Sequence, residues 1–470
     1  MDNPTLDVNM IEEQHSQDNF ADELVWATFL PVGQGFSKCD LIEDTNTFGR
    51  SGCDFCFSSD NDKNHHYRAF SKCHFNVSRE RKGSSTGYNT FIQDMSTNGT
   101  FLNGEKIGKN QKRAIMNNDV ISLAVPNNKA YVFYDIAVAS ASKQFYPKEL
   151  TKHYDISREL GSGACGVVKL AFDKKSCQKY AVKIIKKKNL SFTGGALTST
   201  SRLMQEVKIL KSLHHPCMTT VEDVFDSPEA LCIVLELAEG GELFDRVVKY
   251  GKYAGAREQE FKVIFYQLLE AVKYLHKNNI SHRDLKLENV LLKTDEPYTL
   301  VKLTDFGLAR IVGDKSLMTS YVGTPTYLAP EVLVGNQSYN KAVDLWSLGV
   351  VLYVCLAGYQ PFTASDSEVE DADTIEILKS KVLSRRWYRS PDEWKDVSEE
   401  AKELVRGLMQ VEAADRLSLD EALGHPWLKD ENALEIAKNL MYPDKFPKKR
   451  SADDLESNTN KKMTAGSPNK

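Results

Sequence analysis

The spacing of apolar and polar positions divides the chain into stretches of different character. From about residue 24 to 139, short apolar runs such as 120–125 and 130–138 alternate with clusters of Gly, Asn, Asp and Ser. Strand-length runs separated by turn residues predict an all-β sandwich. After a polar connector, residues 154–237 are again strand-like, whereas Glu258 to His276 places apolar residues at helical spacing. The pattern predicts a β domain followed by a domain that is strand-rich first and helical later.

The two ends of the chain lack this periodicity. Residues 1–23 are polar and acidic, with no Lys or Arg before Lys38, and we expect them to be disordered. The hydrophobic pattern fades again after Trp427, and the last residues are polar with basic clusters. The expected order is an acidic tail, the β domain, a linker, the mixed domain and a basic tail, with bounds 1–23, 24–139, 140–153, 154–428 and 429–470.

Composition narrows the class of protein. A chain of 470 residues has room for two to four domains, and 41% hydrophobic with 27% charged residues is typical of globular proteins. The formal net charge of −5 argues against a direct nucleic-acid partner. The longest charge-free apolar run, Leu345 to Gly358, is too short to span a bilayer. It predicts a buried core helix, and no membrane partner is expected.

The nine cysteines are scattered, which predicts reduced thiols. Cys53, Cys56, residues 65–66 (both His) and Cys73 lie close enough in sequence to be drawn as a zinc site. Their spacing matches no common zinc module, and two phenylalanines flank Cys56. We therefore interpret these cysteines as structural.

Two short segments carry the side chains that phosphoryl transfer needs. Residues 282–289 read HRDLKLEN, and Asp305 begins an Asp-Phe-Gly triplet. Transfer from ATP requires a carboxylate that orients the acceptor hydroxyl and oxygen ligands that hold Mg²⁺ against the phosphates. In this spacing Asp284 is the candidate for the hydroxyl, and Asn289 and Asp305 are the candidates for the metal. The two ordered motifs predict a kinase that uses ATP and Mg²⁺.

A glycine-rich segment and a lysine support the same chemistry. The run Gly161 to Val168 reads GSGACGVV, and Lys183 follows on the next apolar strand. Glycines let the backbone approach the phosphates, and the lysine can bridge the α- and β-phosphates. A dinucleotide-binding fold shares the glycines but gives no reason for the lysine. Glu206, on a helical segment, is the best candidate to hold this ammonium, ahead of Glu222 and Glu229.

Three later motifs complete a family pattern. Glu331 closes an Ala-Pro-Glu triplet, Asp344 begins the run DLWSLG, and Arg416 follows in the helical part. With these motifs, residues 154–428 resemble a complete eukaryotic protein kinase domain. The resemblance implies a two-lobe α+β fold with ATP bound in the cleft. It also implies that Glu331 pairs with Arg416 and that Asp344 braces the catalytic loop.

The same resemblance implies the substrate. Lys286 and Thr324 match the serine/threonine-specific kinases, in which they accompany the catalytic aspartate. Glu242 and Glu288 match acidic positions that receive arginines N-terminal to the target residue, although a ribose contact alone is the alternative for Glu242. Leu235 would be the gatekeeper before a hinge whose backbone binds adenine. The implied ATP-binding residues are Gly161, Ser162, Gly163, Gly166, Val168, Ala181, Lys183, Glu206, Glu236, Ala238 and Glu242.

The β domain carries a second set of motifs, in residues 48–51, 71–74 and 94–104. In order and spacing they resemble the forkhead-associated domain, a β-sandwich whose loops bind phosphothreonine peptides. Lysine replaces the arginine that is usual in the second motif. The resemblance implies that His74 braces the loops and that the ligand contacts are made by Arg50, Ser71, Lys72, Thr97 and Asn98.

Regulation is implied by the residue before the catalytic aspartate. Kinases with an arginine there, as at Arg283, usually need a phosphate on the activation loop. Ser320 aligns best with the activating position, and Thr319 is the second choice. We expect trans-autophosphorylation in a transient homodimer, formed when the β domain gathers two molecules on phosphorylated partners.

Two short sequence features bear on where in the cell the protein acts. Ser16-Gln17 is a single weak match to the sites of damage-sensing upstream kinases. Basic clusters at 448–450 and 461–462 resemble import signals, although solvated tail charge is the alternative. On this basis a nuclear location is expected.

A forkhead-associated domain before a kinase of the calcium/calmodulin-dependent group is the layout of the DNA-damage checkpoint effector kinases. The chain resembles that family, which implies phosphothreonine proteins, protein substrates and an upstream damage-sensing kinase as partners. A meiosis-specific recombination checkpoint kinase has the same layout and remains open. A catalytically dead phosphoprotein-binding adaptor is the rival from another class, disfavoured because the catalytic residues are all present.

Overall fold

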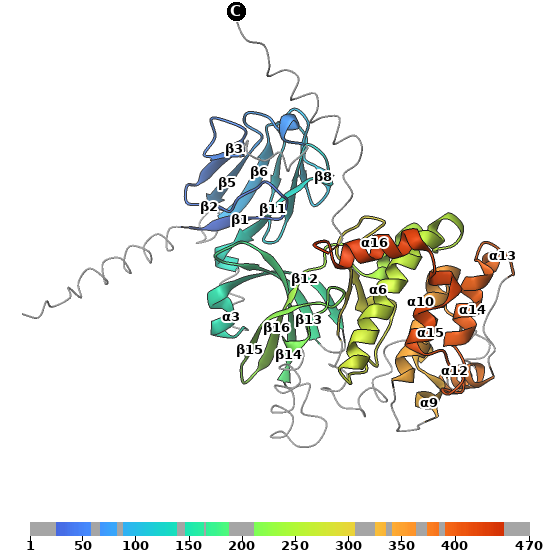
Figure 1. Ribbon diagram of the computed structural model, residues 1–470. Helices are drawn as coiled ribbons and strands as arrows, with labels where there is room; N and C mark the ends of the chain where they lie inside the picture. Colours follow the sequence, from blue (N-terminus) through green and yellow to red (C-terminus); the bar gives the residue numbers. More distant parts are fainter. Residues whose placement is uncertain are drawn as a thin grey trace, which may run out of the picture. The chain divides into compact units, whose positions relative to one another are not determined.

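The computed structural model describes residues 25–57, 66–81, 88–138, 146–163, 166–187, 211–305, 325–334, 341–362, 374–384 and 391–445. The chain divides into two compact units (Figure 1). The first unit contains Met1–Lys188 and Asp223–Leu235, and the second contains Asn189–Glu222 and Glu236–Lys470. One of the three boundaries between the units falls between Leu235 and Glu236, where the hinge is expected. Each unit is described separately.

The first unit begins with a β-sandwich, as the pattern of short strands predicted. One sheet has the order β2-β1-β11-β10-β7-β8 and the other β4-β3-β5-β6-β9. Neighbours pair antiparallel except β3 and β4, which are parallel. The strands are β1 (Ala27–Pro31), β2 (Cys39–Leu41), β3 (Thr45–Gly49), β4 (Phe55–Cys56), β5 (Phe75–Arg81), β6 (Tyr88–Asp94), β7 (Thr100–Leu102), β8 (Glu105–Lys106), β9 (Lys112–Ala114), β10 (Val120–Leu123) and β11 (Lys129–Asp135).

Aromatic side chains from both sheets fill the sandwich core. The rings of Phe48 and Phe75 stack with centroids 4.5 Å apart, and Phe29 meets Phe48 edge-on at 5.1 Å. All three side chains are fully buried, as is Phe133. Offset and edge-on aromatic pairs add to the gain from burial. This rigid core fixes the ends of β3, β5 and β6, where the three polar motifs lie.

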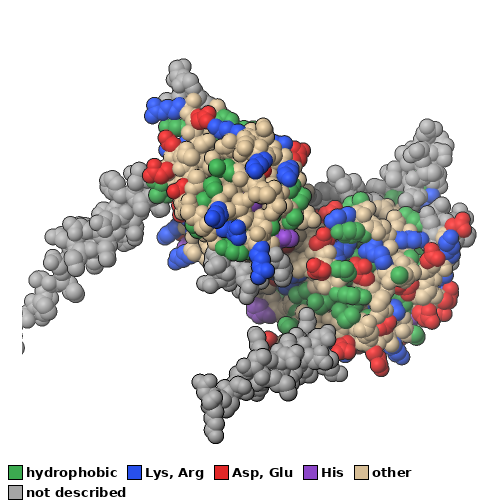
Figure 2. Space-filling model, turned by 90° about the horizontal axis from the view of Figure 1, so that it is seen from above, with side chains coloured by type: hydrophobic (Ala, Val, Ile, Leu, Met, Phe, Trp, Pro, Cys, Tyr) green, Lys and Arg blue, Asp and Glu red, His purple; other side chains and the backbone are tan. Residues whose placement is uncertain are grey.

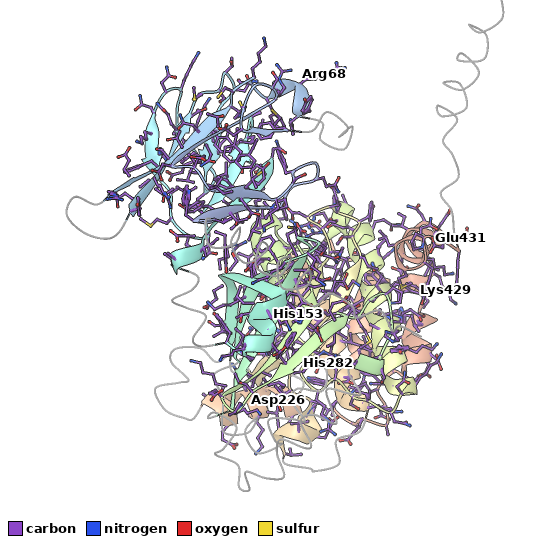
Figure 3. All side chains as sticks on the ribbon, turned by 90° about the vertical axis from the view of Figure 1, so that its left-hand side faces the viewer. Arg68, His153, Asp226, His282, Lys429 and Glu431 are labelled. Carbon is purple, nitrogen blue, oxygen red and sulfur yellow. The ribbon has the colours of Figure 1, made fainter. Side chains whose placement is uncertain are left out.

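The second part of the first unit is a five-stranded sheet with the order β12-β13-β14-β16-β15. Its strands are β12 (Tyr154–Gly163), β13 (Gly166–Asp173), β14 (Lys179–Lys186), β15 (Val221–Asp226) and β16 (Ala230–Glu236). The residues expected to form a plain linker contain helix α3 (Lys148–His153), whose Leu150 is buried in the core of this sheet. His153 ends α3, and its ring stacks with Phe225 of β15 (Figure 3).

The second unit is mainly helical. Its helices are α5 (Leu243–Tyr250), α6 (Glu258–Lys277), α9 (Pro330–Leu333), α10 (Ala342–Ala357), α12 (Thr374–Leu383), α13 (Pro391–Trp394), α14 (Glu399–Leu408), α15 (Leu419–Leu423) and α16 (Glu431–Met441), and a hairpin joins β17 (Val290–Leu292) to β18 (Val301–Leu303). Every residue from Val343 to Ala357 in α10 is buried, which confirms the predicted core helix. None of the helices that the structure describes is long and apolar enough to cross a membrane.

Helix α16 corrects the expectation that the chain is a polar tail after residue 428. Asp430 caps its N-terminus by accepting a hydrogen bond from the Ala433 amide at 3.0 Å. Ala433 and Ala437 are buried against Val263 of α6, and α16 crosses one end of α6 in Figure 1. The buried stripe consists of Ala433, Ala437 and Met441, one turn apart, so two of its three residues are small. Alanines contribute little to an apolar pattern, which is why the helix was missed.

Candidate functional site

The hairpin of β17 and β18 positions the catalytic loop. Residues 282–289 lead into β17, and Asp305 follows β18. Because Val290 pairs with Leu303, the end of the first segment and the start of the second lie side by side. The Thr304 amide extends this ladder by donating to the Asn289 carbonyl at 3.0 Å. The two metal candidates, Asn289 and Asp305, are thus brought together by antiparallel pairing.

Asp284 lies within a small polar network. Its Oδ2 is 3.0 Å from Lys286 Nζ and accepts a hydrogen bond from Asn289 Nδ2 at 2.9 Å. The same Nδ2 donates to the Asp284 carbonyl at 2.6 Å. Burial would lower the pKa of the Lys286 ammonium, but the carboxylates of Asp284, Glu288 and Asp305 outweigh it and raise the pKa. Lys286 therefore stays cationic beside the acceptor site.

Asp344 braces this loop. Its Oδ2 accepts a hydrogen bond from the His282 amide at 2.9 Å, and its Oδ1 accepts one from the Arg283 amide at 2.8 Å. These bonds hold Arg283 at a φ of 66°, and Asp305 also has a positive φ, of 61°. Left-handed backbone at residues other than glycine costs about 1–3 kcal/mol and persists only where surrounding contacts enforce it. The brace that the sequence implied is present, and it stores strain beside the catalytic aspartate.

Two histidines were not assigned a role from sequence. The fully buried His282, labelled in Figure 3, has Nε2 2.9 Å from the Thr304 carbonyl, and its Nδ1 accepts from the Asp284 amide at 3.3 Å. Through these contacts the ring links the segments on both sides of the hairpin. His276 Nε2 lies 2.7 Å from the Asp344 carboxylate. Only the tertiary structure brings His276 to Asp344, so no local sequence signal could have found it.

The expected ion pair between Glu331 and Arg416 is also formed. Arg416 donates from two guanidinium nitrogens to the two Glu331 oxygens, at 3.0 and 3.1 Å. The Arg416 side chain is fully buried and also donates to the carbonyls of Ala342 and Gln410. A bidentate pair fixes both distance and orientation. It ties α9 to the segment that precedes α15.

The hinge residue Glu236 has side-chain partners that the sequence did not reveal. Its carboxylate lies 2.7 Å from Lys293 Nζ and 2.8 Å from Lys302 Nζ. Burial would raise the pKa of this carboxyl, but the two lysines lower it. The Glu236 amide donates to the Thr220 carbonyl at 3.0 Å. The side chain therefore anchors the hinge to the hairpin of the second unit.

Glu242 and Glu288 form an acidic pair near Lys286. Burial and the carboxylates of Asp245 and Glu288 raise the pKa of Glu242, more than Lys286 lowers it. The buried Oε2 of Glu288 has no hydrogen-bond partner among the described residues. A buried carboxylate oxygen without a donor is costly, and a cation placed against it relieves the cost. Such a pair suits an incoming guanidinium.

In the first unit, three neighbouring strands align the predicted nucleotide residues. Gly161 pairs with Val168, which in turn pairs with Lys183. Gly166 has a φ of +139°, and a Cβ there would lie 2.2 Å from the Ile184 carbonyl oxygen, so only glycine fits. Lys183 and Ala181 are both buried. The register places the glycine-rich turn beside the lysine, as the motif requires.

The loops at one end of the sandwich bring the phosphothreonine candidates together. The Arg50 amide donates to the Ser71 carbonyl at 3.1 Å, and the Thr97 amide donates to Ser71 Oγ at 3.0 Å. Asn98 Nδ2 donates to the Ala69 carbonyl at 2.8 Å. Gly49 is required here, because a Cβ would lie 1.8 Å from the Lys72 carbonyl oxygen. All five predicted ligand residues therefore lie on loops that contact one another.

Arg50 has an available donor. Its Nε is buried and has no hydrogen-bond partner among the described residues. The side chains of Lys72, Thr97 and Asn98 are exposed on the same loops. An anion of tetrahedral geometry would satisfy the guanidinium and add charge-assisted hydrogen bonds. The site is therefore suited to a phosphate.

His74 and Asp94 hold these loops from beneath. His74 Nδ1 accepts from the Ser71 amide at 3.0 Å, and its Nε2 lies 3.2 Å from the Gly99 carbonyl. Burial lowers the pKa of His74, so the ring is neutral near pH 7. Asp94 Oδ1 accepts from the Ser96 amide and hydroxyl and from the Thr100 hydroxyl. The sequence singled out His74 as a brace, but Asp94 was missed although an acceptor two residues before a serine is a local turn signal.

Comparison with known proteins decides the family. A protein kinase domain model matches residues 154–428, more than half of the chain, and an FHA domain model matches residues 46–124. The chain belongs to the protein kinase family. The kinase is 42% identical over 381 residues to the ovarian-specific serine/threonine-protein kinase Lok of Drosophila melanogaster, covering 80% of this chain and 76% of Lok.

Other relatives share both domains. The kinase is 35% identical over 391 residues to the serine/threonine-protein kinase cds1 of Schizosaccharomyces pombe, covering 81% of each chain. A crystal structure of residues 1–466 of Rad53 with AMP-PNP matches 86% of this chain and 99% of that one, with 30% identity and a TM-score of 0.51. The resemblance to the checkpoint kinases with a forkhead-associated domain is confirmed, and the enzyme is an ATP-dependent serine/threonine kinase.

Four predicted sites of the kinase lie outside the described residues. They are the lysine partner Glu206, the specificity residue Thr324 and the activation-loop candidates Thr319 and Ser320. The same holds for Ser16 and for the basic clusters near the C-terminus. The roles assigned to these residues stay predictions.

Proposed function

We propose that the kinase transfers the γ-phosphate of ATP to serine and threonine residues that follow an arginine in the substrate. The single observation that supports this preference is the acidic pair near Lys286. Glu242 has a raised pKa partly because Glu288 is close, and Glu288 has a buried oxygen without a donor. An arginine guanidinium can donate to two carboxylates at once with fixed geometry, whereas a lysine ammonium acts as a point charge.

The chemistry follows from the catalytic loop. Asp284 orients the acceptor hydroxyl and accepts its proton, with one oxygen already held by Lys286 and Asn289. Lys286 places a positive charge where negative charge gathers on the transferred phosphoryl group. Asn289 and Asp305 are oxygen donors held side by side, a set that fits Mg²⁺. When bound, Mg²⁺ offsets the charge of the phosphates.

A peptide assay tests the substrate preference. We expect kcat/KM for a serine peptide to fall about 10- to 100-fold when its upstream arginine becomes lysine or alanine, as the loss of a charged hydrogen-bonded contact predicts. In the Glu242→Gln and Glu288→Gln double variant this discrimination should vanish, while the alanine peptide reacts as with the wild-type enzyme. Asp295→Asn, an exposed aspartate of the same unit, is the matched control. Unchanged discrimination in the double variant would reject the assignment.

We further propose that the forkhead-associated domain recruits the kinase to phosphothreonine proteins. The buried Arg50 Nε without a described partner, next to Ser71 and Thr97, supports this role. A phosphothreonine peptide library should bind the wild-type chain, and Arg50→Ala should weaken binding at least tenfold. Arg68→Ala, an exposed arginine of the neighbouring short helix η1 (Tyr67–Ala69), labelled in Figure 3, is the control. Equal binding of phosphorylated and unphosphorylated peptides would contradict the proposal.

The cellular role that we propose is checkpoint signalling in the nucleus after DNA damage or replication stress. The shared layout with cds1, Rad53 and the serine/threonine-protein kinase chk-2 of Caenorhabditis elegans supports it. The name of the Drosophila relative describes an ovarian kinase, which favours a meiotic recombination checkpoint as the second candidate. Pull-down with wild-type and Arg50→Ala chains from damaged, undamaged and meiotic cells separates the two. Asp284→Ala with full cellular function would instead favour the adaptor.

A further inference from the structure

The forkhead-associated domain and the five-stranded sheet of the kinase domain, here called the small lobe, share partly buried polar contacts within the first unit. Ser157 Oγ of β12 donates to Asn118 Oδ1 of the sandwich at 2.5 Å. Lys179 Nζ of β14 donates to the Val32 carbonyl at 2.9 Å. The Asp155 carboxylate of β12 lies close enough to the Tyr134 hydroxyl of β11 to raise its pKa. Three side-chain contacts from three separate sandwich segments meet two strands of the kinase sheet.

Burial marks these contacts as a packed boundary. Tyr134 is 4% exposed and Ser157 is 6% exposed. Burial, together with the nearby Asp155 carboxylate, raises the pKa of the Tyr134 hydroxyl far above its usual value, which keeps it a donor. Buried polar groups are costly when they lose their partners, so each contact favours the packed arrangement.

Charged groups extend the boundary on both sides. Asp155 also lies 3.6 Å from Lys174 Nζ, within the kinase sheet. Lys38 and Asp40 of the sandwich act electrostatically on Cys177, in the turn between β13 and β14. Tyr146, from the connector, packs against the core of the sheet. The connector and the turn thus lie at the same boundary.

The strands at this boundary lead to both ligand sites. On the kinase side, β12 carries Asp155 and Ser157 and ends at the glycine-rich turn, while β14 begins with Lys179 and carries Lys183. On the sandwich side, β11 pairs with β10 and β10 with β7. The Ala124 amide after β10 donates to the Gly99 carbonyl at 2.9 Å, next to the phosphothreonine loop.

We propose that this polar seam, formed by Val32, Asn118 and Tyr134 on the sandwich and by Asp155, Ser157 and Lys179 on the small lobe, docks the forkhead-associated domain onto the kinase of the same chain and couples phosphothreonine binding to nucleotide binding. The coupling rests on the proposed phosphothreonine site, whereas the docking does not. When a ligand displaces the Asn98–Gly99 loop, β10 and β11 shift with it. The polar contacts of the seam transmit this shift to β12, the strand that ends at the glycine-rich turn. Coupling between two sites is reciprocal, so each ligand changes the affinity for the other by the same factor.

Thermal unfolding of the full chain tests the docking without any ligand. Tyr134→Phe and Asp155→Asn should each lower the melting temperature of the first unit, and the double variant should lower it by less than the sum. Ser157→Ala with Asn118→Ala provides a second, independent cycle. Tyr88→Phe, an exposed tyrosine of the same sandwich, should behave additively with Asp155→Asn. Additive effects in both seam pairs would overturn the docking.

Titration of the full chain with Mg²⁺ and AMP-PNP tests the coupling. A saturating synthetic phosphothreonine peptide should change nucleotide affinity by about fivefold, and nucleotide should change peptide affinity by the same factor. The Tyr134→Phe and Asp155→Asn double variant should still bind both ligands, but its affinity for each should not depend on whether the other is bound. Equal nucleotide affinity with and without bound peptide in the wild-type chain would overturn the coupling. If no phosphothreonine peptide binds at all, the proposed recruitment fails while the thermal cycles still decide the docking.

Discussion

At the residue scale, the catalytic loop shows which contacts a motif can and cannot encode. Asp284, Asn289 and Asp305 were assigned from spacing alone, and the hairpin register brings the segments that carry them together. The partners of Glu236 could not be assigned in the same way. Lys293 and Lys302 lie more than fifty residues along the chain and meet this carboxylate only because the hairpin packs beside the hinge. Local motifs therefore identify the reactive residues, whereas the residues that support them are determined by packing between distant parts of the chain.

Asp284→Asn should abolish transfer while leaving the fold intact. The amide keeps the size of the carboxylate and still accepts the Asn289 hydrogen bond, but it cannot accept the hydroxyl proton. We expect kcat to fall about 10²- to 10⁴-fold, with little change in the KM for ATP. Steady-state kinetics and a melting curve measure the two effects. A variant that retains half of the wild-type kcat would show that another group takes the proton.

Glu242 should lower the stability of the fold at neutral pH, although substrate recognition requires it. Its pKa is raised in the folded state, mainly by burial and then by Asp245 and Glu288. A raised carboxyl pKa means that the folded state binds the proton more tightly than the unfolded chain, so ionisation destabilises the fold as pH rises. Glu242→Gln should therefore melt at a higher temperature than wild type at pH 7, and the difference should shrink towards pH 4. Melting curves across this range test the sign; a gap that widens on acidification would refute it.

At the element scale, the strongest periodic segments were predictable and the small-residue helix was not. Helix α10 was expected from one long apolar run and is buried along almost its whole length. Helix α16 was assigned to a polar tail, although Ala433, Ala437 and Met441 form a buried stripe on it and the two alanines pack against α6. Helix α3 lies in the predicted linker, with Leu150 as its buried anchor. Short elements with one or two anchors depend on tertiary packing rather than on pattern.

Ala437→Arg should weaken the docking of α16. The side chain at 437 is fully buried, so a long charged residue overpacks the contact with Val263. Overpacking of a filled contact typically costs about 1–3 kcal/mol, which lowers the melting temperature by several degrees. Glu435→Arg, on the exposed face of the same helix, introduces the same side chain and should have little effect. Equal destabilisation by both variants would indicate a charge effect rather than lost packing.

At the scale of the whole molecule, one chain combines a kinase site with a second site, on the sandwich, that is suited to a phosphate. On the face drawn in Figure 2, lysine and arginine side chains occur together with aspartate and glutamate. The recognition that we propose therefore depends on local groups, Arg50 for phosphate and Glu288 for arginine, which each have a buried side-chain atom without a described partner. Under the proposed recruitment, a ligand that binds the sandwich would change where the kinase acts, and the same ligand would also bring two kinases together.

That second consequence predicts activation by a template. Linking two phosphothreonines in one peptide raises the effective concentration of one kinase near another to roughly the millimolar range. At submicromolar enzyme, a divalent peptide should accelerate phosphorylation of Thr319 and Ser320 at least tenfold, with an optimum at intermediate peptide concentration, because excess peptide separates the two molecules. Mass spectrometry of these sites over time measures the rate.

The controls distinguish a template from simple occupancy of the sandwich. A peptide with one phosphothreonine binds the same loops but cannot join two chains, so it should give no optimum and little acceleration. Arg50→Ala should abolish the effect of the divalent peptide, and the Thr319→Ala and Ser320→Ala double variant should remain inactive with it. If the monovalent peptide activates as strongly as the divalent one, activation occurs within a single chain, and the expected trans-autophosphorylation in a homodimer is wrong.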